Sequence, residues 1–389
     1  MTEERKAPAI RFKEFLDDVW KKRKLGDLGS VEMCKRIFKE ETSEDFEIPF
    51  FKIGTFGGKA DTYITRKKFE EYKAKYPYPN KGDLLISASG SIGRVVEYSG
   101  QEEYYQDSNI VWLNHSGKIE NSFLKQFYSI VTWSGIEGTT IKRLYNKNIL
   151  ETKISLPTPP EQRAIGSFFQ DLDKLITLQQ RKLEVLKEQK KTYLKLLSPA
   201  KGQKKPVLRF AGFEDEWKEV KVSDIFRVTR GQVLATTEIS EEKTDTHKYP
   251  VYSSQTKNEG LLGYYDKYLF ETAITWTTDG ANAGTVNYRE GKFYSTNVNG
   301  VLLSDEGFAN KVIAEILNKE AWKYVSKVGN PKLMNNVMSE ISLVIPNDFR
   351  EISILSSLFQ DLDKFIALQQ RRLDKLQNMK KALLEQMMM

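Results

Sequence analysis

The chain contains one cysteine, Cys34, and only two histidines, His115 and His247. A single thiol excludes an intramolecular disulfide and a thiolate zinc cluster, so we expect Cys34 to be buried and unreactive. Two imidazoles exclude a metal site that needs several histidine ligands. His115 follows an apolar segment at an expected turn, so we expect this histidine at the surface.

No apolar segment is as long as a membrane-spanning helix, and the first residues are charged. We therefore expect a cytoplasmic protein with no membrane partner. Hydrophobic residues make up 40% of the 389 positions, which is enough for packed cores, and the length favours two or more domains. The net charge of +7 is compatible with nucleic-acid binding, although many other proteins share it.

Motifs for common active sites are also missing. The fragment at 54–60 resembles a phosphate-binding loop but lacks its spacing and its hydroxyl residue. No strand-to-helix G-x-G-x-x-G segment and no Asn/Asp-Pro-Pro-Tyr segment occurs. Short Glu-x-Lys fragments such as Glu219-Val-Lys221 are expected by chance in a chain with 29% charged residues. The sequence therefore predicts binding, with no catalytic residue, no metal and no cofactor held by this chain.

The chain is internally duplicated. The segment FFQDLDKLITLQQRKLEVL at 168–186 returns as LFQDLDKFIALQQRRLDKL at 358–376, with 13 of 19 positions identical. Other segments align at nearly the same shift of 190 positions, among them those around Gly93 and Gly284 and around Pro157 and Pro346. Asn109 aligns with Asn299 at 190. A period this long indicates two copies of one domain rather than a solenoid.

Each repeated segment has the three–four spacing of a coiled coil. Both seams carry glutamine and lysine where a plain apolar stripe would have leucine, and such polar residues fix the register of paired helices. We expect the two helices to pair antiparallel, which relates the two copies by a pseudo-twofold axis. The predicted seam residues are Phe169, Leu172, Ile176, Gln179, Leu183 and Leu186, followed by Lys190, and Phe359, Leu362, Ile366, Gln369, Leu373 and Leu376, followed by Lys380.

The remaining segments predict α+β domains. Short β-branched or aromatic runs at 84–89, 110–113, 273–278 and 341–346 are typical of strands. One short helix is expected in each copy, around 122–131 and 309–318. The predicted organisation is a first globular domain (1–157), a long helix (158–198), a linker (199–206), a second globular domain (207–346) and a second long helix (347–389).

Loops of the globular domains carry the residue types that bind DNA. Cationic side chains and small polar residues contact phosphates, while Arg, Gln and Asn read base edges. The alternative for any one of them is an ordinary solvated loop. The DNA-contacting candidates of the first copy are Lys52, Lys59, Tyr63, Arg66, Ser87, Ser89, Ser91, Arg94, Thr139, Thr140, Lys142 and Arg143. Those of the second copy are Arg230, Gln232, Ser253, Ser254, Gln255, Lys257, Thr277, Thr278, Asn282, Asn330 and Lys332.

Several motifs together resemble the specificity subunit of type I restriction–modification systems. They are the Arg-Phe-x-x-Phe starts at Arg11 and at Arg209 of the second copy, the Pro-Thr-Pro-Pro-Glu161-Gln162 entrance to the first long helix, and the FQDLDK…LQQR helices. The loops near 82–86 and 252–254 add to the resemblance. The second helix entrance, at 346–351, departs from the Pro-Pro-Glu-Gln pattern of the first.

The resemblance implies two target-recognition domains, each reading one half of a bipartite site in double-stranded DNA. It implies that the coiled coil sets the spacer and docks two modification subunits, and that restriction subunits join the full complex. The methyl donor S-adenosylmethionine, ATP and Mg²⁺ would then be used by these partners. Two other functions remain open from the residues: a self-contained DNA nuclease or methyltransferase, and a coiled-coil scaffold that binds only proteins.

Overall fold

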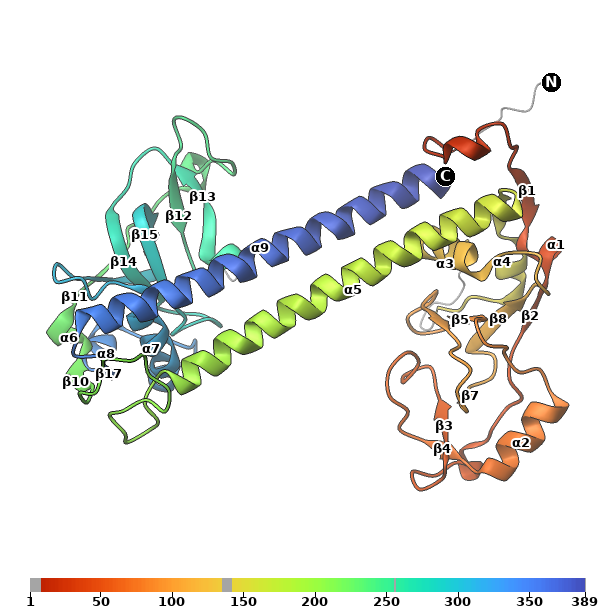
Figure 1. Ribbon diagram of the computed structural model, residues 1–389, viewed down its shortest axis with the longest axis horizontal. Coiled ribbons are helices and arrows are strands. Elements are labelled where there is room, and N and C mark those ends of the chain that lie inside the picture. The colour runs from red at the N-terminus through yellow and green to blue at the C-terminus, as the bar shows by residue number, and fades with distance from the viewer. Residues whose placement is uncertain (1–7, 135–141, 255–256, 389) are drawn as a thin grey trace. The chain divides into compact units, whose positions relative to one another are not determined.

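The computed structural model describes residues 8–134, 142–254 and 257–388 (Figure 1). Thr139, Thr140 and Gln255, which the sequence analysis assigned to DNA contacts, lie outside the described residues, as does the side chain of Lys257. The chain divides into two compact units. Unit 1 comprises residues 1–180 and 372–389, and unit 2 comprises residues 181–371. Each unit thus includes part of both long helices, whereas the predicted division gave each helix a segment of its own.

Unit 1 is built around a four-stranded sheet of order β2-β8-β5-β6. A three-stranded sheet (β4-β3-β7) and the pair β1-β9 accompany it. Its strands are β1 (Lys21–Lys24), β2 (Ser30–Glu32), β3 (Ile48–Phe51), β4 (Tyr63–Ile64), β5 (Leu84–Ser87), β6 (Val95–Glu97), β7 (Tyr104–Tyr105), β8 (Ile110–Asn114) and β9 (Lys153–Leu156). Its helices are α1 (Leu25–Leu28), α2 (Arg66–Lys75), α3 (Asn121–Ile130), α4 (Asn146–Glu151) and the first part of α5 (Pro159–Leu196).

Unit 2 repeats this plan with one longer sheet of order β11-β16-β14-β15-β12-β13 and the pair β10-β17. The long strand β15 occupies the places of both β6 and β7 of unit 1. It pairs with β14 as β6 pairs with β5, and it pairs in parallel with β12 as β7 pairs with β3. Its strands are β10 (Lys218–Lys221), β11 (Arg227–Arg230), β12 (Tyr249–Tyr252), β13 (Leu261–Tyr265), β14 (Phe270–Thr277), β15 (Val286–Ser295), β16 (Asn299–Leu303) and β17 (Ser342–Ile345). Its helices are α6 (Val222–Ile225), α7 (Lys311–Ala321), α8 (Asn335–Ser339) and the first part of α9 (Phe349–Met388).

Successive strand residues point to opposite faces of a sheet, so each central sheet has two faces to cover. In unit 1, Leu84 and Ile86 of β5 share a core with Phe123 of α3 and Phe169 of α5. In unit 2, Ile274 and Trp276 of β14 share a core with α7 and with the long helices. One face of each sheet therefore packs on helices, which leaves the other face to differ between the units.

A glycine holds the same tight turn in both units. The N–H of Gly93 donates to the carbonyl of Ser87, and the N–H of Gly284 donates to the carbonyl of Thr277, each at 2.9 Å. Both glycines have positive φ, 81° and 84°. A Cβ at Gly93 would lie 2.8 Å from the Trp133 indole nitrogen, and one at Gly284 would lie 2.7 Å from a Val325 methyl group. Only glycine fits this turn without strain.

The long helices run antiparallel within each unit. In unit 1, Lys380 of α9 pairs with Asp173 of α5 at 2.6 Å. In unit 2, Lys190 of α5 pairs with Asp363 of α9 at 2.7 Å. The two lysines are the polar seam positions of the sequence analysis, and each meets an aspartate of the opposite helix. The seam residues identified from the sequence, Phe169, Leu172, Ile176, Gln179, Leu183, Leu186, Phe359, Leu362, Ile366, Gln369, Leu373 and Leu376, are buried or half-buried.

A buried ion pair connects the first residues of each sequence copy to a long helix. The guanidinium of Arg11 donates to both carboxylate oxygens of Glu161 at 2.8 Å, and Arg209 donates to both of Glu351 at 2.7 and 2.8 Å. The carboxylates are 0% and 1% exposed. Glu351 keeps this contact although its surroundings lack the Pro-Pro-Glu-Gln motif.

The predicted α+β fold with a pseudo-twofold repeat and antiparallel long helices is confirmed. Cys34 is buried as expected, and burial raises the pKa of its thiol to about 12. The expectation of a surface histidine is wrong for His115, which is 7% exposed. Its Nε2 lies 2.7 Å from Asn121 Oδ1, so a polar partner at the start of α3 makes burial of the ring possible.

Candidate nucleic-acid interface

Two of the predicted DNA-contacting segments of unit 1 lie side by side. Ser89 forms an antiparallel bridge with Arg143, and the N–H of Leu144 donates to the carbonyl of Ala88 at 2.8 Å. The hydroxyl of Ser89 donates to Asn109 at 2.8 Å. The segment at 88–94 after β5, here called the Ser/Gly loop, therefore lies beside the segment at 142–143.

The same contact recurs in unit 2. Asp279 forms an antiparallel bridge with Lys332, and the N–H of Leu333 donates to the carbonyl of Thr278 at 2.8 Å. The loop that contains Thr277, Thr278 and Asn282 is thus joined to the segment that contains Asn330 and Lys332. In each unit, two segments that were selected separately from the sequence are therefore neighbours, and the contact lies at equivalent positions in the two units. We call these two segments the loop pair of the unit.

Other candidates of unit 1 are placed less uniformly. Arg94 donates to the carbonyl of Phe56 at 2.8 Å, which joins the Ser/Gly loop to the segment that contains Lys52 and Lys59. Lys52 and Arg66, however, form exposed ion pairs with Asp61 and Glu102. Tyr63 belongs to β4 of the smaller sheet. No contact of the described residues brings Tyr63 or Arg66 to the loop pair.

Some predicted hydroxyl groups serve the fold itself. Ser87 is 1% exposed and donates to the carbonyl of Ser91 within the loop. Thr278 is 7% exposed and donates to the carbonyl of Val298 at 2.9 Å. These two side chains hold their loops in shape. Ser91, Arg94, Lys142, Asn330 and Lys332 are exposed.

In unit 2, Arg230 and Gln232 lie beside the turn between β15 and β16. Arg230 donates to the carbonyl of Asn297 at 2.7 Å, and Gln232 bridges Thr296. The hydroxyl of Thr296 in turn donates to that of Ser253 at 3.1 Å. These contacts join Arg230 of β11, Gln232 after it and the segment after β12 into one region.

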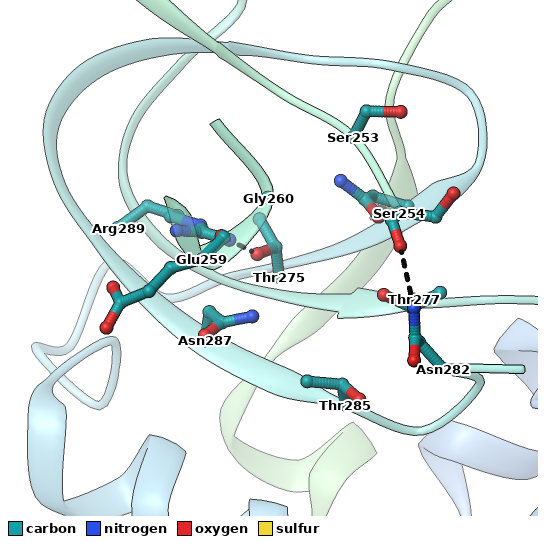
Figure 2. A pocket seen from close by; sticks show the side chains of 11 residues that line it. Ser253, Ser254, Glu259, Gly260, Thr275, Thr277, Asn282, Thr285, Asn287 and Arg289 are labelled. Atoms are coloured by element: carbon teal, nitrogen blue, oxygen red, sulfur yellow. Dashed lines mark hydrogen bonds between the residues drawn. The ribbon is translucent and has the colours of Figure 1, made fainter. Parts of the chain in front are cut away.

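A polar cavity of about 240 Å³ opens in this region (Figure 2). Four predicted residues line it: Ser253, Ser254, Thr277 and Asn282. Asn282 reaches across it and donates to the carbonyl of Ser254 at 3.2 Å (Figure 2). The structure therefore gathers residues from two separate loops around a single space.

The cavity also contains a residue that sequence reasoning missed, Arg289 of β15, which is 4% exposed. Its Nε donates to the hydroxyl of Thr275 at 3.1 Å, and its Nη2 donates to the carbonyl of Glu259 at 2.6 Å (Figure 2). Its guanidinium carbon lies 3.8 Å from the centroid of the Tyr252 ring. Burial lowers the pKa of Arg289, while the nearby Tyr252 hydroxyl and Glu259 carboxylate act in the opposite direction.

Thr275, Asn287 and Asn299 line the cavity as well and were also missed. They lie within strands, where a polar residue alone resembles a solvated strand face. A signal was present in the internal repeat, because the shift of 191 at Gly93 also aligns Asn287 with Val96 and Arg289 with Tyr98. The observed register corrects the alignment of Asn299 with Asn109: Thr277 faces Asn299 across the ladder as Ser87 faces Ile110.

No group of histidine, cysteine, aspartate or glutamate side chains that could hold a metal ion occurs in residues 8–134, 142–254 and 257–388. In the same part of the chain, no helix combines the length and the apolar character that a membrane span requires.

Comparison with known proteins identifies the family. The model of the type I restriction modification DNA specificity domain matches twice, at residues 17–188 and 214–378. A Haemophilus influenzae protein named as a type I restriction enzyme specificity subunit is 52% identical over 164 residues, which are 42% of each chain. A Mycoplasma pneumoniae protein named as the N-terminal part of a type I specificity subunit is 38% identical over 151 residues, 38% of this chain and 77% of that one. The chain thus spans about two fifths of the H. influenzae relative.

Solved structures share the fold over nearly the whole chain. The S subunit of a type I restriction-modification system from M. genitalium matches with a TM-score of 0.69 at 17% identity, over 98% of this chain and 99% of that one. A second match, from a study of the assembly and conformational transition of the type I system, has a TM-score of 0.53 at 13% identity, over 94% and 96%. With two copies of the family domain and this shared fold, the chain belongs to the family of type I restriction-modification DNA specificity proteins.

Proposed function

We propose that this chain recognises a bipartite site in double-stranded DNA, with one half-site read by each unit. The observation that carries this proposal is the repeated loop pair, built by the Ser89–Arg143 bridge in unit 1 and the Asp279–Lys332 bridge in unit 2. The bridges have the same geometry, whereas the side chains that the two loop pairs expose differ. Equivalent scaffolds with different exposed side chains suit two half-sites of different sequence.

Binding of the purified chain to duplex DNA at several salt concentrations tests this function. Contacts between cationic side chains and phosphates release counterions, so the affinity should fall by at least about tenfold between 50 and 200 mM salt. A fluorescence anisotropy titration with a random-sequence duplex measures this slope. A coiled-coil scaffold that binds only proteins would show no DNA binding at low salt, and that result would contradict the proposal.

We further propose that methyl transfer and DNA cleavage are carried out by partner subunits, which would use S-adenosylmethionine, ATP and Mg²⁺. The support is the family membership together with the lack of recognisable catalytic motifs in the sequence. Incubation of the purified chain with DNA, Mg²⁺ and S-adenosylmethionine should leave the DNA unmethylated and uncut. Turnover by the chain alone would favour the self-contained enzyme instead.

A repeated apolar patch offers a docking surface for two modification subunits. In α5, Leu175 and Leu178 are 40% and 61% exposed, and at the equivalent positions of α9, Phe365 and Leu368 are 58% and 45% exposed. Exposed leucine and phenylalanine side chains this close together are typical of protein interaction sites. Because the patch occurs once on each helix, it fits two copies of the same partner.

The variants Leu178→Asp and Leu368→Asp should each lose one modification subunit from the complex, and the double variant should lose both. The reason is that a carboxylate in an apolar interface loses its hydration without gaining a partner. Native mass spectrometry of the co-expressed proteins measures the stoichiometry. Glu184→Ala, at another exposed position of α5, is the control. Retention of two subunits by the double variant would show that this patch is not the docking surface.

A further inference from the structure

The strand positions that line the polar cavity of unit 2 have equivalents in unit 1, because the central strands of the two sheets share their register. Leu85 pairs with Val96 across β5 and β6, and Thr275 pairs with Asn287 across β14 and β15. Tyr98 follows β6 as a backbone partner of Asp83, and Arg289 occupies the equivalent place opposite Ala273. Residues at equivalent strand positions of unit 1 and unit 2 can therefore be compared directly.

At four such positions unit 1 has an apolar or aromatic residue where unit 2 has a polar one. Leu85, Tyr98 and Ile110 belong to one apolar core of unit 1, with Val96 packed against it. Their equivalents in unit 2 all line the cavity: Thr275, Arg289, Asn299 and Asn287, respectively. Because unit 1 builds the same sheet with an apolar core here, the fold itself does not require polar residues at these positions.

The cavity of unit 2 also holds a buried polar group without a hydrogen-bond partner among the described residues. Asn299 is 2% exposed, and its side-chain nitrogen has no hydrogen-bond partner among the described residues. Arg289 uses its Nε and Nη2 in the hydrogen bonds to Thr275 and to the Glu259 carbonyl, and no carboxylate of the described residues forms an ion pair with it. Buried donors without acceptors reduce the stability of a fold, so a ligand that supplies acceptors would be favoured here.

We propose that this cavity reads a guanine of the second half-site, with Arg289 and Asn299 donating to its O6 and N7 acceptors. This inference rests on the proposed DNA-recognition function. Guanine is the base that presents two adjacent acceptors, which matches two buried donors. The exposed side chain of Glu259 lines the same cavity, and its carboxylate repels a phosphate but accepts from the amino group of the paired cytosine.

Sequence selection by the full-length chain from a pool of random duplex DNA tests the proposal. The wild-type chain should enrich two half-sites with a guanine in the second one. Arg289→Gln should reduce the preference for that guanine by about 5- to 150-fold and leave the first half-site unchanged. Asn299→Ile, which introduces the residue of the equivalent position in unit 1, should weaken the same preference. Thermal unfolding verifies that each variant is folded, and Arg350→Ala, at an exposed side chain of unit 2, is the control.

The outcomes separate the inference from the function on which it rests. Unchanged selection at every position of the second half-site by both variants would overturn the guanine assignment while DNA recognition stands. Equal weakening for all sequences, with a smaller salt slope, would overturn it in favour of a phosphate contact. Failure of the wild-type chain to enrich any sequence would overturn the proposed function and, with it, this inference.

Discussion

Glu161→Gln should destabilise unit 1 by about 3 kcal/mol, because it leaves the buried Arg11 guanidinium without its charged partner. The side chains of Arg11 and Glu161 are 4% and 0% exposed, and Trp20 also donates to Glu161 at 3.0 Å. Removal of one member of a buried ion pair costs more than the pair contributes, since the remaining charge stays desolvated. Removal of one partner from a buried ion pair typically costs about 3 to 5 kcal/mol. The lower value is expected here because the Arg11 residue as a whole is only partly buried.

Hydrogen exchange measured for peptides of each unit resolves this effect, because a chain with two units need not unfold in one step. The slowest amides of unit 1 should exchange about a hundredfold faster in the variant, while those of unit 2 keep their rates. Asp171→Asn, which removes an exposed ion pair with Lys174, is the control and should change little. The double variant Arg11→Met, Glu161→Met should recover much of the loss. Equal exchange rates in Glu161→Gln and wild type would refute the assignment.

The parts of the fold with strong periodicity could be predicted from the sequence. The seam of Phe169, Leu172 and Leu183 defines a helix face without knowledge of its partner, because one turn of helix repeats every 3.6 residues. Comparison of the two copies located Gly93 and Gly284, and the structure gives both the same turn and the same lack of space for a Cβ. Local backbone requirements and helix periodicity are properties of a few neighbouring residues.

The cavity could not be predicted in this way because it depends on the register between strands. Arg289 is followed by Glu290 in a polar stretch and resembles a solvated residue when the strand is considered alone. Its burial follows from the segment before β13, whose Glu259 carbonyl closes over it, and from the Tyr252 ring of β12. These contacts join residues 30 and more positions apart, which no local pattern reports. His115 was misplaced for a different reason: its partner Asn121 is only six positions away, but this partner belongs to the following helix and not to the apolar segment before His115.

The grouping of the chain into units has a similar origin. The sequence separates helices from globular parts, because helix periodicity begins and ends within the chain. Packing groups residues differently: the end of α9, with Leu384 and Met387, shares the core of unit 1 with Phe169 of α5. Likewise, Leu197, directly after α5, shares the core of unit 2 with Phe359 of α9. Each long helix is therefore stabilised by both copies, so a change in helix length bears on both.

Because residues of both long helices pack in the cores of both units, we expect the length of these helices to set the DNA spacer. Insertion of one heptad with the seam rhythm after Gln180 in α5, and of another after Arg371 in α9, should lengthen the spacer between the half-sites. Seven helical residues add about 10.5 Å, and base pairs stack about 3.4 Å apart, so the increase should be between one and about three base pairs. Both half-site sequences should stay the same, because no residue of the recognition loops changes.

Enrichment from random duplex DNA reads the spacer and both half-sites in one experiment. The control adds the same seven residues after Gly202, in the exposed segment between α5 and β10, where the helices keep their length. We expect the control to keep the wild-type spacer and the paired insertion to lose binding to sites with that spacer. A paired insertion that selects the original spacing would refute the idea that helix length sets it. An altered half-site would show instead that the long helices contribute to base recognition.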